Sequence, residues 1–318
     1  MVALCRKFEY NRFITTFFQC PDARQEDAGM NRLPLIGPLL PAAALLLVLS
    51  ACGGTAESAA PCLMDTAQAK VEQMDSLDAR MVTELDIETG GGTIETTTTV
   101  DMTCFREPVR TKAQMRMDVE MSINMGKVDS AYMSVYAEAG EDGAGQLYLS
   151  DGANWYVQSA GAEELSLYDA QNSLSLCISC GSGLTPAGQE EIDGVQTVKY
   201  TGAITAGDTM REILLSAGMA DALDALDAAG TSGRQAEELL VRLGEIPVSL
   251  WIDQTTSYPV RYEMELTALM NAIAGHLAEA AEAEGPEVCY TKTSVVMTCS
   301  NFNQAAEFTI PEAVYMAG

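Results

Sequence analysis

The chain has 318 residues with 18 Lys or Arg and 45 Asp or Glu, which gives a formal charge of −27 at neutral pH. So acidic a chain argues against binding to nucleic acid, because phosphate backbones require a basic footprint. It also argues against electrostatic adhesion to anionic lipid surfaces. The acidic residues are spread along the sequence, which favours a solvated surface over a specific cation site.

The N-terminal region does not have the pattern of a folded domain. Residues 33–51 carry no charge, are rich in Leu, Ala and Pro, and follow Arg32. A positive charge, an apolar core and small residues at the end are typical of a secretory signal. The prolines within the run argue against an uninterrupted membrane-spanning helix.

The apolar run ends in Leu49-Ser50-Ala51-Cys52, and a cysteine directly after this small pair resembles the bacterial lipobox. The resemblance implies that residues 30–51 are a lipoprotein signal peptide and that Cys52 becomes a diacylglyceryl-cysteine, carrying acyl chains such as palmitate. The mature chain would then be extracytoplasmic, lipid-anchored to the cell membrane at the surface of a bacterium. The alternatives are an ordinary signal or a single membrane anchor.

The remaining N-terminal boundaries follow from this reading. Residues 1–29 are charged, aromatic and unlike a signal, and we interpret them as a mis-assigned upstream extension, because Met30 begins a signal of ordinary length. Residues 52–61 form the lipidated cysteine and a flexible tether of small polar residues. We expect residues 62–318 to form a single domain.

Six cysteines follow Cys52, an even number that suggests disulfides in an exported protein. They are Cys62, Cys104, Cys177, Cys180, Cys289 and Cys299. For the closest pair, Cys177 and Cys180, a structural disulfide or unpaired thiols are favoured over a redox centre, because glycines rather than a helix follow it. No metal is expected, since a four-cysteine zinc site would need two pairs that lie 108 residues apart.

From Met81 onward, apolar and polar residues alternate with a period of two, which predicts strands with one dry and one wet face. The clearest stretch places Ala113, Met115, Met117, Val119, Met121 and Ile123 on one face. Further strands are predicted at Ser130–Ala137, Gln146–Ser150, Asn154–Gln158, Val195–Gly202, Ile246–Asp253, Pro259–Leu266 and Val288–Phe302. Short turns such as Asp193-Gly194 join them, which indicates an antiparallel meander.

Apolar residues at helical spacing precede and interrupt these strands. The spacing predicts a helix over residues 63–77, helices that open at Thr209 and Ser232, and an Ala-rich helix over Thr267–Glu284. This order of elements predicts an α+β fold. We expect a large curved antiparallel sheet, an unclosed half-barrel, with helices packed on its concave face.

Two neighbouring sequences carry a resemblance to a known family. They are Ile246-Pro-Val-Ser-Leu-Trp-Ile-Asp253 and Tyr258-Pro-Val-Arg-Tyr-Glu-Met-Glu265. With the strands around the Asp-Gly turns, this hairpin resembles the LolA/LppX-like superfamily of periplasmic lipoprotein carriers and mycobacterial lipid-binding lipoproteins. The lipobox and the closing segment Thr298–Asn303 also resemble uncharacterised lipoproteins of Gram-positive anaerobes. The resemblance implies an open barrel with helices plugging its mouth, around an apolar cavity for acyl chains.

No pattern in the sequence supports an enzyme. His276 is the single histidine, so a Ser-His-Asp triad would have to use it, and no G-x-S-x-G motif accompanies it. Phosphate-binding and dinucleotide-binding glycine patterns are also missing from the sequence. We therefore predict neither catalytic residues nor a cofactor.

Methionines on the predicted strand faces suit a cavity for flexible acyl chains, although they would equally fill an irregular core. The expected apolar lining is Met115, Met117, Val119, Met121, Leu250, Ile252, Val260, Tyr262 and Met264. The hypothesis is a lipoprotein that binds a lipid or other hydrophobic ligand without catalysis. The alternative is a structural or interaction lipoprotein with a plugged barrel, whose acidic outer face, including Asp118 and Glu120, binds an unknown protein partner.

Overall fold

A computed structural model describes residues 62–122, 127–140, 145–161, 165, 170–179, 183–205, 245–280, 288–312 and 314. The predicted upstream extension, signal peptide, lipidated Cys52 and tether therefore lie outside the described residues, as do Cys180 and the predicted helices that open at Thr209 and Ser232. Within the described ranges, no helix combines the length and hydrophobicity that crossing a bilayer requires.

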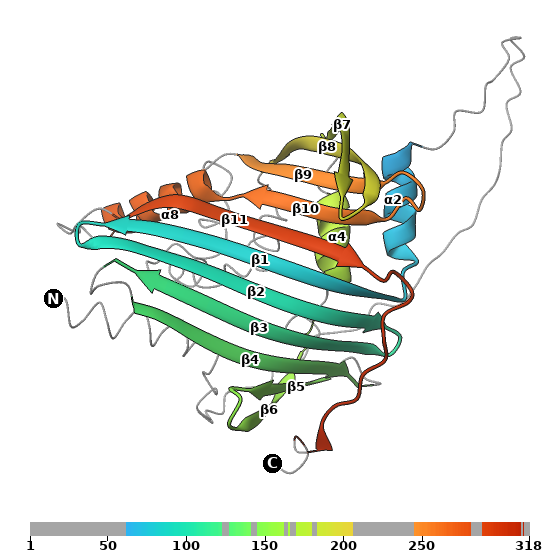
Figure 1. Cartoon of the computed structure of the whole chain (residues 1–318), viewed down its shortest axis with the longest axis horizontal. Coiled ribbons are helices and arrows are strands. Elements are labelled where there is room, and N and C mark those ends of the chain that lie inside the picture. Colours follow the sequence, from blue (N-terminus) through green and yellow to red (C-terminus); the bar gives the residue numbers. More distant parts are fainter. Residues whose placement is uncertain are drawn as a thin grey trace, which may run out of the picture. The chain divides into compact units, whose positions relative to one another are not determined.

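Eleven antiparallel strands form one open sheet (Figure 1). The strands are β1 (Ser76–Thr89), β2 (Gly92–Arg106), β3 (Val109–Met121), β4 (Lys127–Ala139), β5 (Gly145–Ser150), β6 (Trp155–Ala160), β7 (Thr185–Ile192), β8 (Val195–Thr205), β9 (Glu245–Asp253), β10 (Pro259–Glu265) and β11 (Cys289–Ser300). Their order in the sheet is β6-β5-β4-β3-β2-β1-β11-β10-β9-β8-β7. Each half is thus a meander, and the pairing of β11 with β1 joins the two. The predicted antiparallel α+β fold is confirmed.

The described helices lie against one face of the sheet, which we call the inner face. They are α2 (Leu63–Glu72), α4 (Ala170–Ser179) and α8 (Thr267–Ala280). Strand register identifies the residues on this face: Met297 lies opposite both Met81 and Tyr262, in the neighbouring strands β1 and β10. Met297 and Tyr262 are buried in the same cluster as residues of all three helices.

Two groups of buried side chains lie under the inner face. The main core joins α2, α4 and α8 to β1, β2 and β8–β11, with Val71, Leu174, Leu250, Ile273 and Met297 among its members. A second core lies under β2–β6 and consists of Val100, Ala113, Val135, Ala137, Leu147, Leu149, Ala160 and Leu165. Burial of apolar area contributes about 25 cal/mol per Å². The main core spans both meanders, and the second core lies within the first meander.

The predicted helix over residues 63–77 is wrong over residues 73–77. Helix α2 ends at Glu72, and Leu77 already lies in β1, opposite Cys104 of β2. Met74 and Leu77 are fully buried, which explains why their spacing imitated a helix. The backbone N–H of Asp75 donates a hydrogen bond of 2.7 Å to the side-chain oxygen of Asn303, which fixes the chain between helix and strand.

The sequence did not predict one helix, α4, and did not give the bounds of one strand, β7, the first strand of the predicted hairpin at Asp193-Gly194. Helix α4 buries Leu174, Cys177 and Ile178, which have the i, i+3, i+4 spacing of a helix face, so a signal was present. Strand β7 gave no such signal, because nearly all of its residues are exposed and no apolar alternation arises. Its turn at Asp193-Gly194 has positive φ at both residues, as the predicted hairpin requires.

The segment after β11 crosses the outer face of the sheet. Asn303 donates its backbone N–H to the carbonyl oxygen of Ser76 at 2.8 Å and its side-chain amide to the hydroxyl of Tyr258 at 2.9 Å. Further along, the ring of Phe308 lies 5.9 Å from those of Phe105 and Tyr136. In Figure 1 this red segment passes the ends of neighbouring strands. It therefore connects the turn before β10 with β1, β2 and β4.

We predict that Phe308→Ala lowers the free energy of unfolding by about 1–3 kcal/mol, because each aromatic contact contributes roughly 0.5–1.5 kcal/mol. Urea denaturation measures the loss. The matched control is Glu307→Ala, which removes an exposed ion pair with Arg110 and should cost less than about 1 kcal/mol. Equal losses for the two variants would show that Phe308 does not anchor the segment.

Candidate functional site

The inner face of β1–β4 changes character along the strands. Near one end Leu77, Cys104 and Ala113 are buried in the two cores. Further along the same strands, every described inner residue is only half-buried. We call this part the methionine face; it consists of Met81, Thr83, Leu85, Ile94, Thr96, Thr98, Met115, Met117, Val119, Met121, Ala131 and Met133.

Strand pairing brings these side chains together. Thr98 of β2 lies between Thr83 of β1 and Met117 of β3, and Met117 in turn lies opposite Ala131 of β4. Met81, Met115 and Met133 pack against the cores, whereas neither described core includes Met117, Val119 or Met121. Met117, Val119 and Met121 therefore present apolar surface that the described core side chains do not occupy.

The residues that define the methionine face are suited to binding an apolar group. Its side chains are Met, Leu, Ile, Val, Ala and Thr, while Arg116, Asp118 and Glu120 of β3 alternate with them and face the other way. Unbranched thioethers adapt to partners of varied shape. Such a surface can bind an alkyl chain through dispersion and burial of apolar area. The residues that define it carry no titratable group, and backbone pairing places Asp129 and Lys127 of β4 opposite Val119 and Met121 at its end.

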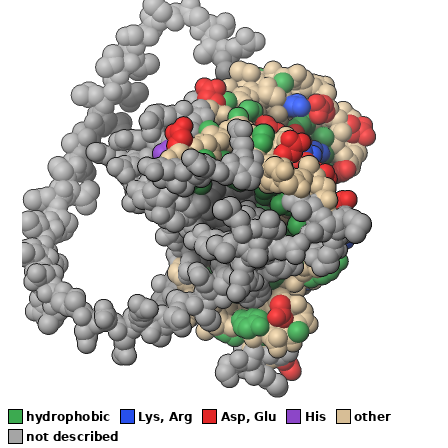
Figure 2. Space-filling view, turned by 90° about the vertical axis from the view of Figure 1, so that its left-hand side faces the viewer, with side chains coloured by type: hydrophobic (Ala, Val, Ile, Leu, Met, Phe, Trp, Pro, Cys, Tyr) green, Lys and Arg blue, Asp and Glu red, His purple; other side chains and the backbone are tan. Residues whose placement is uncertain are grey.

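Figure 2 views the molecule from the side on which the β1–β2 hairpin lies in Figure 1. Acidic side chains gather on the upper part of the described surface, and hydrophobic ones lie between and below them. Acidic and apolar side chains thus lie side by side on this part of the described surface.

The structure divides the lining predicted from sequence into separate places. Leu250, Ile252, Tyr262 and Met264 lie on the inner face but are at most 4% exposed, within the main core that the helices cover. Met115, Met117, Val119 and Met121 lie on the methionine face. Val260 is half-buried at a β-bulge of β10 and contributes to a groove together with outer-face residues of β1–β3.

We predict that Leu250→Ala lowers the free energy of unfolding by about 2–5 kcal/mol, because it leaves a cavity in a closed core. Met117→Ala should cost only about 1 kcal/mol, because a half-buried side chain loses less area on truncation. Urea denaturation of both variants measures the difference. An equal, large loss at Met117 would mean that the methionine face is ordinary core.

Three buried thiols lie near one another in the main core. Burial raises the pKa of the Cys299 thiol, and the neighbouring Cys104 and Cys177 act in the same direction. Burial likewise raises the pKa of Tyr262, whose hydroxyl has no hydrogen-bond partner among the described residues. Thiols held in the protonated form are poor nucleophiles and poor metal ligands. The sequence signal for this grouping was the shared inner-face parity of Cys104 and Cys299.

The structure describes some, but not all, of the cysteines for which the sequence suggests disulfides. Cys177 lies in the last turn of α4, but its predicted partner Cys180 lies outside the described residues, so the Cys177–Cys180 disulfide stays a prediction. Cys62, Cys289 and Cys299 form no disulfide within the described part of the chain. In that same part, no group of three or more His, Cys, Asp or Glu side chains is arranged to hold a metal ion.

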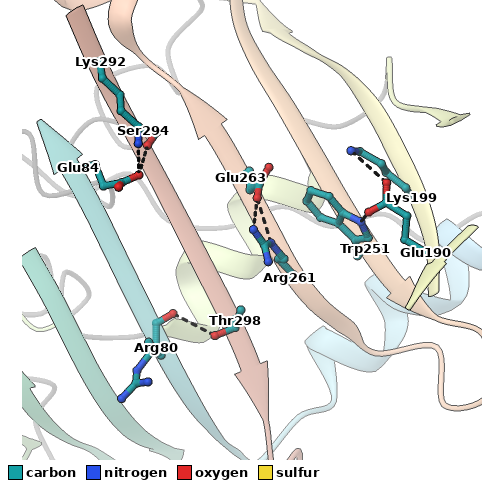
Figure 3. Close-up of polar contacts among 10 residues, drawn as sticks. All are labelled: Arg80, Glu84, Glu190, Lys199, Trp251, Arg261, Glu263, Lys292, Ser294 and Thr298. Carbon is teal, nitrogen blue, oxygen red and sulfur yellow. Dashed lines mark hydrogen bonds and ion pairs between the residues drawn. The ribbon is translucent and has the colours of Figure 1, made fainter. Parts of the chain in front are cut away.

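The outer face carries polar contacts instead (Figure 3). The indole N–H of Trp251 donates a hydrogen bond of 2.7 Å to Glu190 of β7, and Lys199 lies 4.6 Å from the indole ring and 3.5 Å from the same carboxylate. Arg261 covers the ring at 5.3 Å and pairs with Glu263. Trp251 is consequently only 3% exposed, although it lies away from the helices.

The Trp251 hydrogen bond holds the pKa of Glu190 below its usual range; desolvation opposes this effect and the Lys199 charge supports it. A lowered folded-state pKa means that the ionised carboxylate stabilises the fold above the ordinary glutamate pKa of about 4.3 and that this contribution is lost as pH falls through the folded value. We predict that the loss of stability caused by Glu190→Ala is larger at about pH 7 than at about pH 3.

Urea unfolding followed by tryptophan fluorescence measures this difference. The control is Glu191→Ala, which removes the adjacent exposed carboxylate but keeps the Trp251 contact, and it should leave the native-state emission unchanged. If Glu190→Ala costs the same stability at both pH values, the ionised carboxylate is not the group that stabilises β7 on the sheet.

A polar groove of about 560 Å³ also lies on the outer face. Its lining includes Asp78, Arg80, Asp101, Lys112 and Gln114, together with the tip of the β7–β8 hairpin. Arg80 and Asp101 form an ion pair of 2.6 Å in which both side chains are about half exposed. An acyl chain in this groove would lie against charged and amide side chains and would strip water from them. The groove is therefore unsuited to an apolar ligand.

No protein family and no curated protein matches this sequence. Solved structures are similar in fold. The Mycobacterium tuberculosis lipoprotein LppX is 16% identical with a TM-score of 0.40, over 78% of this chain and 96% of LppX. LprF from Mycobacterium bovis is 16% identical with a TM-score of 0.38, over 79% of this chain and 95% of LprF. A DUF1329 family protein from Desulfovibrio piger is 8% identical with a TM-score of 0.24, over 78% of this chain and 93% of that protein. The likeness extends over most of both chains, but it concerns the fold only.

Proposed function

We propose that this chain is an extracytoplasmic lipoprotein, anchored by lipid on Cys52, that binds a lipid or another hydrophobic ligand against the methionine face without transforming it. The observation that carries the proposal is the half-buried apolar surface at Met117, Val119 and Met121, beyond both described cores. Apolar surface left partly open in a soluble domain favours a binding site.

The contrast with the rest of the inner face supports this location. Under α2 and α4, residues such as Leu250 and Ile252 are fully buried, so the fold is able to close its inner face where side chains fill it. On the methionine face the strands continue with the same alternation but without that closure. A flexible ligand would remove the same apolar area from water, at about 25 cal/mol per Å².

The anchor follows from the N-terminal sequence. Arg32, the uncharged run 33–51 and the small residues before Cys52 have the order of a lipoprotein signal. Ten residues then lead from Cys52 to Cys62, where α2 is about to begin. An extended chain spans at most ~3.6 Å per residue, so α2 would begin within about 36 Å of the lipid-bearing cysteine. The domain would thus stay close to the membrane that supplies its ligand.

We predict that the soluble chain from Glu57, exported and purified without detergent, carries a ligand of several hundred daltons in native mass spectrometry. Met117→Lys should remove it, because a charge at the centre of the methionine face would be desolvated by an acyl chain. The control Gln114→Lys adds the same charge to an exposed residue of the same strand and should retain the ligand.

The other outcomes are equally informative. A bare wild-type protein that also fails to bind added fatty acid would remove the ligand-binding proposal. The outer acidic face would then be the remaining functional surface, with Asp118→Lys and Glu120→Lys as the variants that disturb a protein contact. Ligand retained in Met117→Lys would place the site elsewhere on the inner face.

A further inference from the structure

The polar groove of the outer face has the size of a small-molecule site. Its volume of about 560 Å³ lies within the range of roughly 300–1,000 Å³ that such sites occupy. Strands β1 and β3 contribute Arg80 and Gln114 to its lining, and the β7–β8 turn contributes Asp193. Figure 3 shows Arg80 of β1 beside Thr298 of β11, two of the lining residues. The groove thus joins residues from distant parts of the sequence.

Two of the charged groups in the groove are neutralised by each other. The guanidinium of Arg80 donates hydrogen bonds of 2.6 and 3.0 Å to the two carboxylate oxygens of Asp101. The Asp78 carboxylate accepts a hydrogen bond of 2.8 Å from the hydroxyl of Thr103. A guanidinium has five N–H donors and a carboxylate has about four lone-pair sites, so both groups keep capacity for a ligand. They can bind polar groups of a ligand that carries no charge itself.

Three further polar side chains of the groove have no hydrogen-bond or ion-pair partner among the described residues. They are the half-buried Lys112 and the exposed Gln114 and Asp193. An ammonium group only donates hydrogen bonds, a carboxylate only accepts them, and an amide does both. A hydroxyl group also does both, so a ligand with many hydroxyl groups can satisfy all three kinds of side chain at once.

An exposed aromatic ring lies next to the groove. Ser134 of β4 pairs with Gln114 of β3, and Tyr132 follows on the same face of β4, where Arg116 lies 5.8 Å from its ring. Gln114 and Tyr132 are therefore diagonal neighbours, roughly 7–8 Å apart, which is within reach of an aromatic side chain. Tyr132 is 61% exposed. The face of an aromatic ring is electron-rich and apolar, so the C–H groups of a sugar ring can pack against it.

We propose that this groove is a binding site for a neutral oligosaccharide. Lys112, Gln114 and the Arg80–Asp101 pair bind its hydroxyl groups, and one of its sugar rings packs against Tyr132. The site lies on the outer face, so it is separate from the methionine face.

The charges of the groove favour a neutral ligand over an ion. An anion would approach a chain of net charge −27 and would lie beside Asp78, Asp101 and Asp193 in the groove itself. A metal ion would require a set of carboxylates, and the described part of the chain arranges no three His, Cys, Asp or Glu side chains to hold one. Hydroxyl groups meet neither obstacle, because they bind donors and acceptors alike.

The first experiment is an array of immobilised glycans, probed with the labelled full chain in a polyoxyethylene detergent, which contains no sugar. The array presents neutral oligosaccharides of glucose, galactose, mannose and N-acetylglucosamine beside sulfated and uronic acid-containing ones. We expect binding to one or more of the neutral oligosaccharides. Binding to none of them, or to the anionic ones alone, would overturn the proposal.

Calorimetric titration with the best neutral oligosaccharide then tests the site. Lys112→Met should weaken binding about tenfold or more, the loss expected for one hydrogen bond to a charged group. Its matched control is Lys292→Met, which removes an outer-face lysine that pairs with Glu84 and does not line the groove. The control should bind as wild type does.

A second pair of variants tests the aromatic contact. Tyr132→Ala should weaken binding roughly three- to tenfold, while Tyr156→Ala, which removes an exposed tyrosine outside the groove, should not. Urea unfolding reports whether each variant is folded; Tyr132→Ala keeps the test valid if Lys112→Met is unstable, because its ring is exposed. Binding that neither Lys112→Met nor Tyr132→Ala weakens would place the sugar elsewhere and overturn the proposal. None of these results depends on whether the methionine face binds a lipid.

Discussion

The pairing of β1 with β11 is the constraint on which the rest of the fold depends. Every other strand pair joins neighbours in sequence, but this one joins the first strand to the last. It brings Met81 opposite Met297 and so places the side chains of both meanders on one continuous inner face. The helices can then close a single main core across the joint, with residues of β1, β2 and β8–β11 in one cluster.

One part of the inner face is fully buried and another part is only half-buried. The half-buried part is the candidate site. Where α2 and α4 contact the sheet, the inner face is occupied by protein side chains. On the methionine face the sheet continues with the same alternation, but Met117, Val119 and Met121 remain half-buried. The outer face differs again, since it is held by hydrogen bonds and ion pairs around Trp251 and by the C-terminal segment around Phe308.

Alternation along the sequence was sufficient to predict which residues share a face, and the fold class followed from it. It was not sufficient to predict which part of that face other elements would cover. Leu250 and Met117 follow the same period of two, yet one is fully buried and the other is not, because coverage depends on distant helices. The error at Leu77 has the same origin: a buried position in a strand happened to fit the spacing of the preceding helix.

The β1–β11 joint also has a kinetic consequence. Strand β1 begins at Ser76 and its partner β11 begins only at Cys289, so the joint closes a loop of more than two hundred residues. Contacts this far apart in sequence form slowly, because the entropy of loop closure must be overcome first. While the chain folds, β1 therefore keeps one unpaired edge until β11 reaches it. Only the core under β2–β6 can form before that step without residues of the second meander.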